Sequence, residues 1–137
     1  MYTELKIRDK SDNNIDAAEL LIAKGLHSSS VHCSYYGSFQ RIMYSLKNHL
    51  GISYSDLDNM CKGKDSHIFL IRLCCDEFKK KGKTAREAND LDRDLNDLKI
   101  LRKKSDYKDE IIVPDDSDEA LRISNRVIRL LKSTFLP

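Results

Sequence analysis

Several residue types that shape other folds are scarce in this chain of 137 residues, which has no Trp, 2 Pro and 5 Gly. Charged residues make up 34% of the chain and apolar residues 40%. Few helix breakers together with many charges favour long amphipathic helices over a sheet with many turns. The length predicts one domain over residues 1–137, large enough to bury a core without disulfides.

Long apolar runs and a large excess of one charge sign are also absent. No run approaches the roughly 20 apolar residues that a membrane span needs. The first residues show no basic region followed by an apolar core, as a secretory signal would. The 24 basic and 22 acidic residues give a net charge of +2, which argues against a protein whose whole surface coats nucleic acid. A confined basic patch is compatible with that balance.

Cysteines are few, and no two of them form a Cys-x-x-Cys pair. They are Cys33, Cys61, Cys74 and Cys75. Zinc is conceivable because His32 and His67 lie nearby, but ligand pairs at zinc spacing are missing. We expect buried, reduced thiols in a cytoplasmic protein without membrane association, metal or cofactor.

Hydrophobic periodicity predicts an all-α, up-and-down bundle of about five helices. The expected helices cover residues 15–26, 27–50, 66–78, a long stretch from residue 85 that ends before the break at 111–116, and 117–135. Residues 52–66 are interpreted as a loop with a helical turn near 54–60.

Capping residues place the ends of these helices. Ser11–Asn14 is a cluster of N-cap formers before the first helix, and Gly51 stands where a helix C-terminal glycine belongs. Ser66 is expected to cap the third helix. Thr84 and Glu87 form a capping box. Ser117–Glu119 is expected to start the last helix.

Arg102 is the most informative single residue. The long helix from residue 85 carries Leu91, Leu95 and Leu98 on one seam, and Arg102 occupies the next seam position. An arginine there must be paired or must face a cleft, because an unpaired buried charge is costly. One interpretation is contact with a phosphate across a dimer cleft. The other is an ion pair with Asp106 one turn later, or with a carboxylate of a neighbouring helix.

Three further side chains are candidates for the same site. Tyr36 and Tyr107 could stack on a base, although such tyrosines are more often core or interface residues with one satisfied hydroxyl. His67 is a candidate catalytic imidazole, and its alternative is a partly exposed polar residue at a helix start.

A basic stripe on the last helix is formed by Arg122, Arg126 and Arg129. It could follow a phosphate backbone, or it could be a solvated face that pairs with acids. A matching acidic stripe lies on the preceding helix and consists of Asp90, Asp94 and Asp97. No metal-bearing motif accompanies these acids, so we interpret them as a solvated or partner surface rather than a magnesium site.

An ordered set of motifs resembles the HEPN domain family, over about residues 13–136. The matching segments are Ala17–Leu21, the double-aromatic segment Val31–Phe39, Ser66–His67, Leu101–Tyr107 and the closing helix Ser117–Phe135. Within the second segment, Gly37 takes the place of the family's usual alanine. The resemblance implies a compact helical bundle of about this size.

Compared with the ribonuclease members of the family, this sequence lacks one residue of the catalytic motif. Ribonuclease members carry an Arg, four to six residues, then a His, and two copies in a dimer form one metal-independent cleft. Here Arg102 is followed after four residues by Tyr107, and no His occurs after His67. A phenol, with a reference pKa of ~10, is a poor general base at neutral pH. The chain therefore resembles the non-nucleolytic branch, whose signature includes Arg102, Asp106 and Tyr107.

Two functions follow from this resemblance. The first is a non-catalytic binding module, expected to be a homodimer that acts with a protein encoded nearby, a nucleotidyltransferase or a defence subunit. Its ligand would be RNA or a nucleotide, in a toxin–antitoxin or antiphage setting. The alternative is a diverged metal-independent ribonuclease that uses Arg102 and Tyr107, with His67 as a further candidate. A helical adaptor unrelated to this family is a third interpretation.

Overall fold

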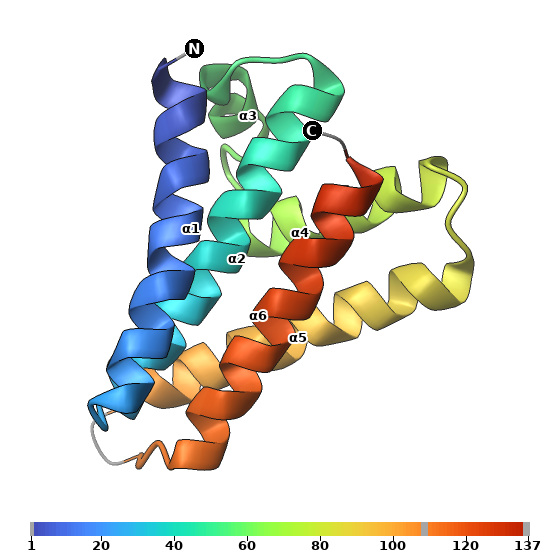
Figure 1. Ribbon diagram of the computed structural model, residues 1–137. Coiled ribbons are helices and arrows are strands. Elements are labelled where there is room, and N and C mark those ends of the chain that lie inside the picture. The colour runs from blue at the N-terminus through green and yellow to red at the C-terminus, as the bar shows by residue number, and fades with distance from the viewer. Residues whose placement is uncertain (1, 108–109, 136–137) are drawn as a thin grey trace.

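Six α-helices and no strand make up residues 2–107 and 110–135, the part of the chain that the computed structural model describes (Figure 1). They are α1 (Tyr2–Ala23), α2 (His27–Leu50), α3 (Tyr54–Met60), α4 (Ser66–Lys80), α5 (Ala85–Asp106) and α6 (Pro114–Thr134). The predicted all-α bundle is confirmed. The prediction of about five helices is one short, because the helical turn expected near residues 54–60 is a helix. The ends of the expected domain, residues 1, 136 and 137, lie outside the described residues.

The start of α1 differs from the prediction. The helix begins at Tyr2 and runs through Ser11–Asn14, which was expected to cap it. These polar side chains bond to α2 instead of to the ends of a helix. The buried Ser11 hydroxyl donates to the carbonyl oxygen of Gly37 at 2.6 Å, and the Asn14 amide donates to Gln40 at 2.8 Å. Interhelical contacts therefore stabilise helical backbone at residues that often cap helices.

Two other helix starts differ from the prediction, by one residue in the cap of α4, which begins at Ser66 as expected, and by three residues in the start of α6. The side chain of Asp65, not Ser66, caps α4 by accepting a hydrogen bond from the Ile68 N–H at 3.0 Å. Helix α6 begins at Pro114 rather than Ser117. A proline fits the first helical position because its missing N–H would have no partner there. The break expected at residues 111–116 is therefore partly the first turn of the helix.

Two predicted helix ends are confirmed. Gly51 ends α2 with a φ of 67°, in the left-handed region where glycine is favoured. Thr84 and Glu87 form the capping box that starts α5, with the Glu87 N–H donating to the threonine hydroxyl at 3.1 Å.

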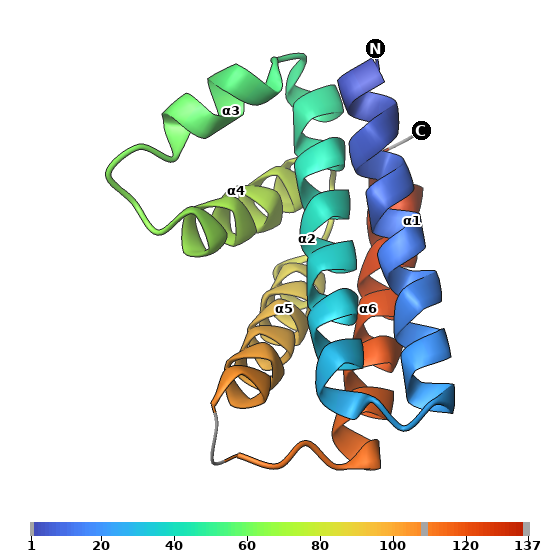
Figure 2. The same cartoon turned by 90° about the vertical axis from the view of Figure 1, so that its left-hand side faces the viewer.

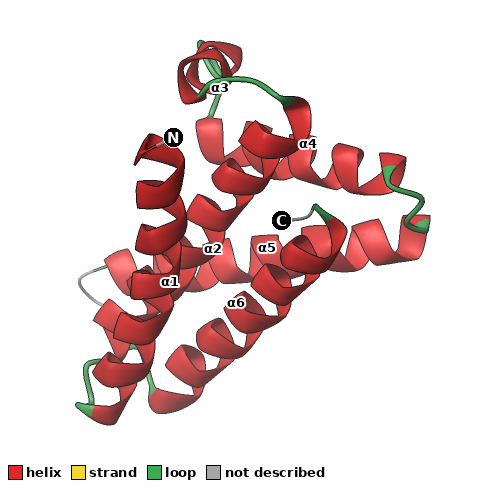
Figure 3. Cartoon of the chain, turned by 45° about the horizontal axis from the view of Figure 1, so that its top comes forward, coloured by secondary structure: helices red, strands yellow, loops and turns green. Residues whose placement is uncertain are grey.

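Helix α2 lies at the centre of the molecule and contacts α1, α3, α4, α5 and α6. Figure 2 shows α4 and α5 on the opposite side of α2 from α1. The turn between α4 and α5 lies far from the turn between α1 and α2 (Figure 3). Apolar side chains of α2 and α6 and the predicted seam of α5 meet in one core, which includes Ile42, Leu46, Leu91, Leu98 and Leu131. This arrangement brings the middle of α2, the start of α4 and the end of α5 together.

The cysteines are free thiols. Cys74 and Cys75 are buried in the core, and burial raises the pKa of Cys75 to about 12 and that of Cys74 further still. No group of three His, Cys, Asp or Glu side chains that could hold a metal ion occurs in residues 2–107 and 110–135. Within the same ranges, no helix has the length and hydropathy needed to cross a membrane.

Candidate anion-binding site

Seven side chains from three helices meet where α2, α4 and α5 converge, and we call them the Arg102 cluster. They are His32, Tyr35, Tyr36 and Phe39 of α2, His67 of α4, and Arg102 and Asp106 of α5. Four of them were candidates from the sequence alone, namely Tyr36, His67, Arg102 and Asp106. Tyr36 of the motif Val31–Phe39 thus lies close to Arg102 and Asp106 of the motif Leu101–Tyr107, which is distant in sequence.

Tyr35 and His67 form the base of the cluster. The tyrosine hydroxyl is hydrogen-bonded to Nδ1 of His67, and the planes of the two rings are parallel to within 4°, with the centroids 5.5 Å apart. On one face of the imidazole, the ring of Phe39 stacks with its centroid 4.2 Å away and its plane tilted by 12°. The His67 ring is therefore held by a hydrogen bond in its plane and by an aromatic face.

The protonation states in this pair follow from burial. Burial raises the pKa of Tyr35 to about 12, so the phenol keeps its proton at neutral pH. Burial, with the nearby Arg102 cation as a second cause, lowers the pKa of His67, so the imidazole is neutral. A phenol that keeps its proton can donate to Nδ1, and we infer that it does. The one imidazole proton then lies on Nε2, which becomes a hydrogen-bond donor.

Arg102 lies over the face of Tyr35, with its guanidinium carbon 4.9 Å from the ring centroid. Its side chain is 20% exposed, and Nη1 lies 3.6 Å from Asp106 Oδ2, longer than a normal hydrogen bond. Its Nε is buried and has no hydrogen-bond partner among the described residues. A guanidinium has five N–H donors. Arg102 is therefore a fixed cation with unused donors.

Asp106 closes the cluster at the end of α5. Its Oδ1 lies 2.7 Å from Nε2 of His32, so one carboxylate bridges His32 and Arg102. The ring of Tyr36 stacks parallel to His32 at 6.4 Å and is 37% exposed. The predicted pairing of Arg102 with Asp106 is thus present, in a loose form. The exposed Tyr36 ring stands beside it.

Tyr107 does not join the cluster. It follows the last residue of α5 as its C-cap, and it is 62% exposed. No ring contact or side-chain hydrogen bond connects Tyr107 to Arg102 or to His67 among the described residues. The structure thus places Tyr107 apart from the other sequence candidates.

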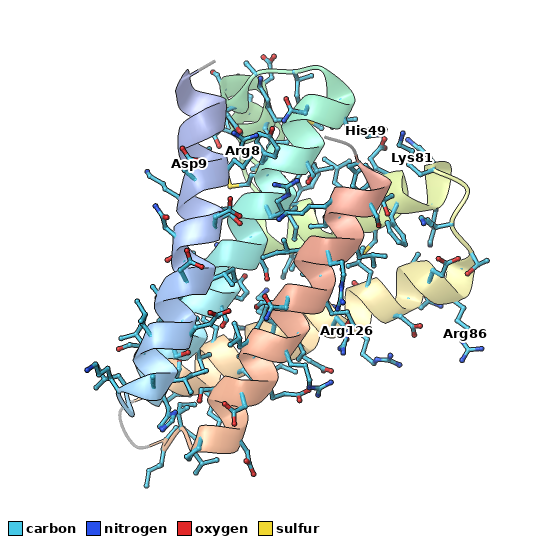
Figure 4. All side chains as sticks on the ribbon, viewed as in Figure 1. Arg8, Asp9, His49, Lys81, Arg86 and Arg126 are labelled. Atoms are coloured by element: carbon cyan, nitrogen blue, oxygen red, sulfur yellow. The ribbon has the colours of Figure 1, made fainter. Side chains whose placement is uncertain are left out.

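The predicted basic stripe on α6 is mostly paired with acids. Arg126 forms a bidentate pair with Asp94 of α5, with N–O distances of 2.8 and 2.7 Å, and Figure 4 shows Arg126 on the side of α6 that faces α5. Arg122 pairs with Glu119 one turn earlier. Arg129 lines a groove of about 660 Å³ between α5 and α6. Two of the three arginines, Arg122 and Arg126, therefore pair with acids, as the second interpretation of the stripe expects.

The chain matches no model of a known protein family, no curated protein and no solved structure.

Proposed function

We propose that the chain is a HEPN-type binding module that holds a phosphate group of RNA or of a nucleotide at the Arg102 cluster. The ordered resemblance to the HEPN family supports this proposal, together with the meeting of its two central motifs at one site. In this proposal the protein is not an enzyme.

One observation carries the proposal, the fixed guanidinium of Arg102 with its unused donors. Stacking on Tyr35 holds the guanidinium in place, and the long contact to Asp106 leaves its hydrogen-bonding capacity largely unfilled. The Nε2–H that we infer for His67 adds a neutral donor beside it. Planar guanidinium groups bind phosphate oxygens in pairs. The exposed ring of Tyr36 provides a face on which a base can stack.

A partner surface belongs to the same proposal. Exposed apolar side chains occur close to the cluster in sequence: Ile68 follows His67, Tyr107 follows Asp106, and Ile100 precedes Arg102 by two residues. Clustered apolar exposure is typical of interaction surfaces. We propose that this surface forms a homodimer or contacts a protein encoded nearby, in a toxin–antitoxin or antiphage setting. Light scattering that shows a strict monomer at high protein concentration would exclude the homodimer.

The binding function is tested by calorimetry with inorganic phosphate and with a nucleoside monophosphate. Arg102→Met should weaken binding of both by about tenfold or more, because a charge-assisted pair is lost. Arg86→Met is the matched control, since Arg86 is exposed in the first turn of α5 (Figure 4), at the opposite end of that helix from Arg102. Equal binding by the wild type and the Arg102→Met variant would overturn the proposal.

A metal-independent ribonuclease is the second candidate, and the pairing of His67 with Tyr35 beside Arg102 favours it. His67 takes the place of Tyr107 as the candidate base, since its imidazole is neutral at pH 7 and lies within the cluster. Catalysis needs the opposite tautomer, with Nδ1–H donating to the Tyr35 oxygen and a lone pair on Nε2. RNA should then be cut in the presence of a chelator, and His67→Ala should abolish cutting. Intact RNA after incubation with the wild type would eliminate this candidate.

A further inference from the structure

A second, smaller groove lies between α4 and α5, next to the Arg102 cluster. Its volume is about 310 Å³, and its lining includes Ile68 of α4 and Lys99, Ile100 and Lys103 of α5. Figure 2 shows α4 and α5 side by side along this region. The groove and the cluster share neighbouring residues, because Ile68 follows His67 and Lys103 follows Arg102. Lys99 of the groove and Arg102 of the cluster are three residues apart on α5, so the groove begins within one helical turn of the cluster.

The groove carries an excess of unpaired positive charge. Three of its lining residues are cations, Arg72, Lys99 and Lys103, and one is a carboxylate, Asp92. None of the three cations has an ion-pair or hydrogen-bond partner within residues 2–107 and 110–135. Asp92 accepts a hydrogen bond from the Asn96 amide at 3.2 Å. An anion is the ligand that such a lining favours.

The larger groove between α5 and α6 differs in this respect. Its charged lining is balanced, with Arg93, Arg126 and Arg129 against Glu87, Asp90 and Asp94. Two of those arginines already pair with carboxylates of the same groove, Arg93 with Asp90 and Arg126 with Asp94. The two grooves therefore differ in the charge of their linings, and only the smaller one has an excess of cations.

Lys99 is the residue that makes this groove a site rather than a charged surface. It is 8% exposed, so its aliphatic stem is covered by protein while its ammonium has no partner among the described residues. Its charge acts on His67 and on Asp65, which places the ammonium close to the base of the cluster. The ammonium itself keeps access to solvent, because it is not among the buried polar atoms that lack a partner. A bound anion can therefore reach a cation whose stem is held in place by packing.

The spacing of Lys99 and Arg102 indicates how many charged groups the ligand carries. They lie three residues apart on α5, and residues at this spacing are neighbours on one helix face. We propose that the Arg102 cluster and the groove hold two linked phosphates, the second of them at Lys99. The assignment of the first phosphate to Arg102 rests on the proposed function. The ligand class is a chain with consecutive phosphates, which a nucleoside polyphosphate and a single-stranded RNA both supply.

Calorimetry with inorganic phosphate and pyrophosphate tests this proposal. The wild type should bind pyrophosphate more tightly than phosphate. Lys99→Met, which keeps the apolar stem, should lower pyrophosphate affinity by about tenfold, roughly the effect of one charge-assisted hydrogen bond, and should change phosphate affinity by less than about twofold. Lys99→Arg retains the charge and should retain the preference for pyrophosphate. Lys81→Met removes the same charge at the other end of α4 and should change neither affinity.

The outcomes distinguish this inference from the proposed function. If phosphate binding depends on Arg102 but Lys99→Met and Lys81→Met bind pyrophosphate equally well, the groove proposal is wrong and the proposed function stands. If Arg102→Met leaves pyrophosphate binding intact while Lys99→Met weakens it, the groove binds an anion and the proposed function is wrong. Parallel titrations with a nucleoside triphosphate and a short single-stranded RNA show which of the two ligands supplies the linked phosphates. Equal affinity of wild type and Lys99→Met for both would overturn the proposal.

Discussion

The hydroxyl of Tyr35 on α2 is hydrogen-bonded to Nδ1 of His67 on α4, and the planes of the two rings are parallel to within 4°. This contact joins two helices whose residues are far apart in sequence, and the guanidinium of Arg102 lies over the same tyrosine ring. Tyr35 therefore positions both the imidazole and the guanidinium. Its role in the site is to orient two other side chains.

Tyr35→Phe removes the hydrogen bond to His67 while keeping the ring under Arg102. We expect the free energy of unfolding to fall by about 1 kcal/mol, as for loss of one hydrogen bond in a partly buried site. The fraction of His67 protonated on Nε2 should also fall, because Nδ1 loses its donor. Urea denaturation measures the first effect and ¹⁵N NMR of the imidazole measures the second. An unchanged tautomer ratio would show that Tyr35 does not donate to Nδ1.

The pH dependence of stability should carry the signature of His67. Its pKa is lowered in the folded protein by burial and by the Arg102 cation, and Lys99 acts in the same direction while Asp65 opposes them. The unfolded chain then binds a proton more readily than the folded protein does. The free energy of unfolding should therefore fall as pH drops through about 6.5 toward the folded pKa.

His67→Gln isolates this contribution, because glutamine does not titrate. We expect the wild type to lose more stability than the variant between about pH 7.5 and about pH 5.5. Urea denaturation of both proteins at the two pH values gives the difference. Equal losses would mean that the pKa of His67 is the same in the folded and unfolded states.

The sequence predicts the helices well because their apolar seams have the helical period. Leu91, Leu95 and Leu98 were expected on one seam and are all buried in the core. The start of α1 could not be predicted in this way, because Ser11 and Asn14 are stabilised by partners on α2 that lie 26 residues away. Those interhelical contacts outweigh the local propensity of these residues to cap a helix.

The candidate site was predictable only in part, for a similar reason. Arg102 stood out because it interrupts an apolar seam, and Tyr36, His67 and Asp106 belonged to the motifs that resemble the HEPN family. Tyr35 and Phe39 lie in the same motif as Tyr36, at apolar positions four residues apart, and nothing in their spacing separates a core ring from one that orients His67. The burial of the Lys99 side chain is likewise a tertiary property, which no spacing in the sequence reveals.

Gly37→Ala tests the close contact of α1 with α2. A Cβ at this position would lie 2.7 Å from Cδ1 of Ile15 and 3.2 Å from the carbonyl oxygen of Ser11. Alanine gains up to ~1 kcal/mol in helix propensity, whereas crowding in a packed core costs typically ~1–3 kcal/mol. We expect a net loss of about 1 kcal/mol in thermal or urea denaturation. Ile15→Val, which removes Cδ1, should reduce that loss in the double variant, and an unreduced loss would place the strain elsewhere.

Asp94→Asn should weaken the junction of α5 with α6. Asp94 is buried and accepts two hydrogen bonds from Arg126, whose own side chain is 42% exposed. Because solvent screens the arginine, we expect a loss of about 1 kcal/mol, less than for a fully buried pair. Asp97→Asn is the matched control, since Asp97 is exposed on the same helix, and it should change stability by less than about 0.5 kcal/mol. Equal effects of the two substitutions would show that the bidentate pair adds nothing measurable.

Asp106→Asn should raise the affinity of the Arg102 cluster for phosphate. The carboxylate of Asp106 lies 3.6 Å from the guanidinium and faces the anion that the site is proposed to bind, so it competes for Arg102. Its removal should increase phosphate affinity by about threefold to tenfold at low salt, with a smaller gain at high salt, because part of the effect is screened. Calorimetry of the wild type, Asp106→Asn and Asp97→Asn separates a local effect from a change in net charge. An equal gain in both variants would show that the effect is one of net charge, and weaker binding in Asp106→Asn would show that the bridge from His32 to Arg102 holds the guanidinium in its binding position.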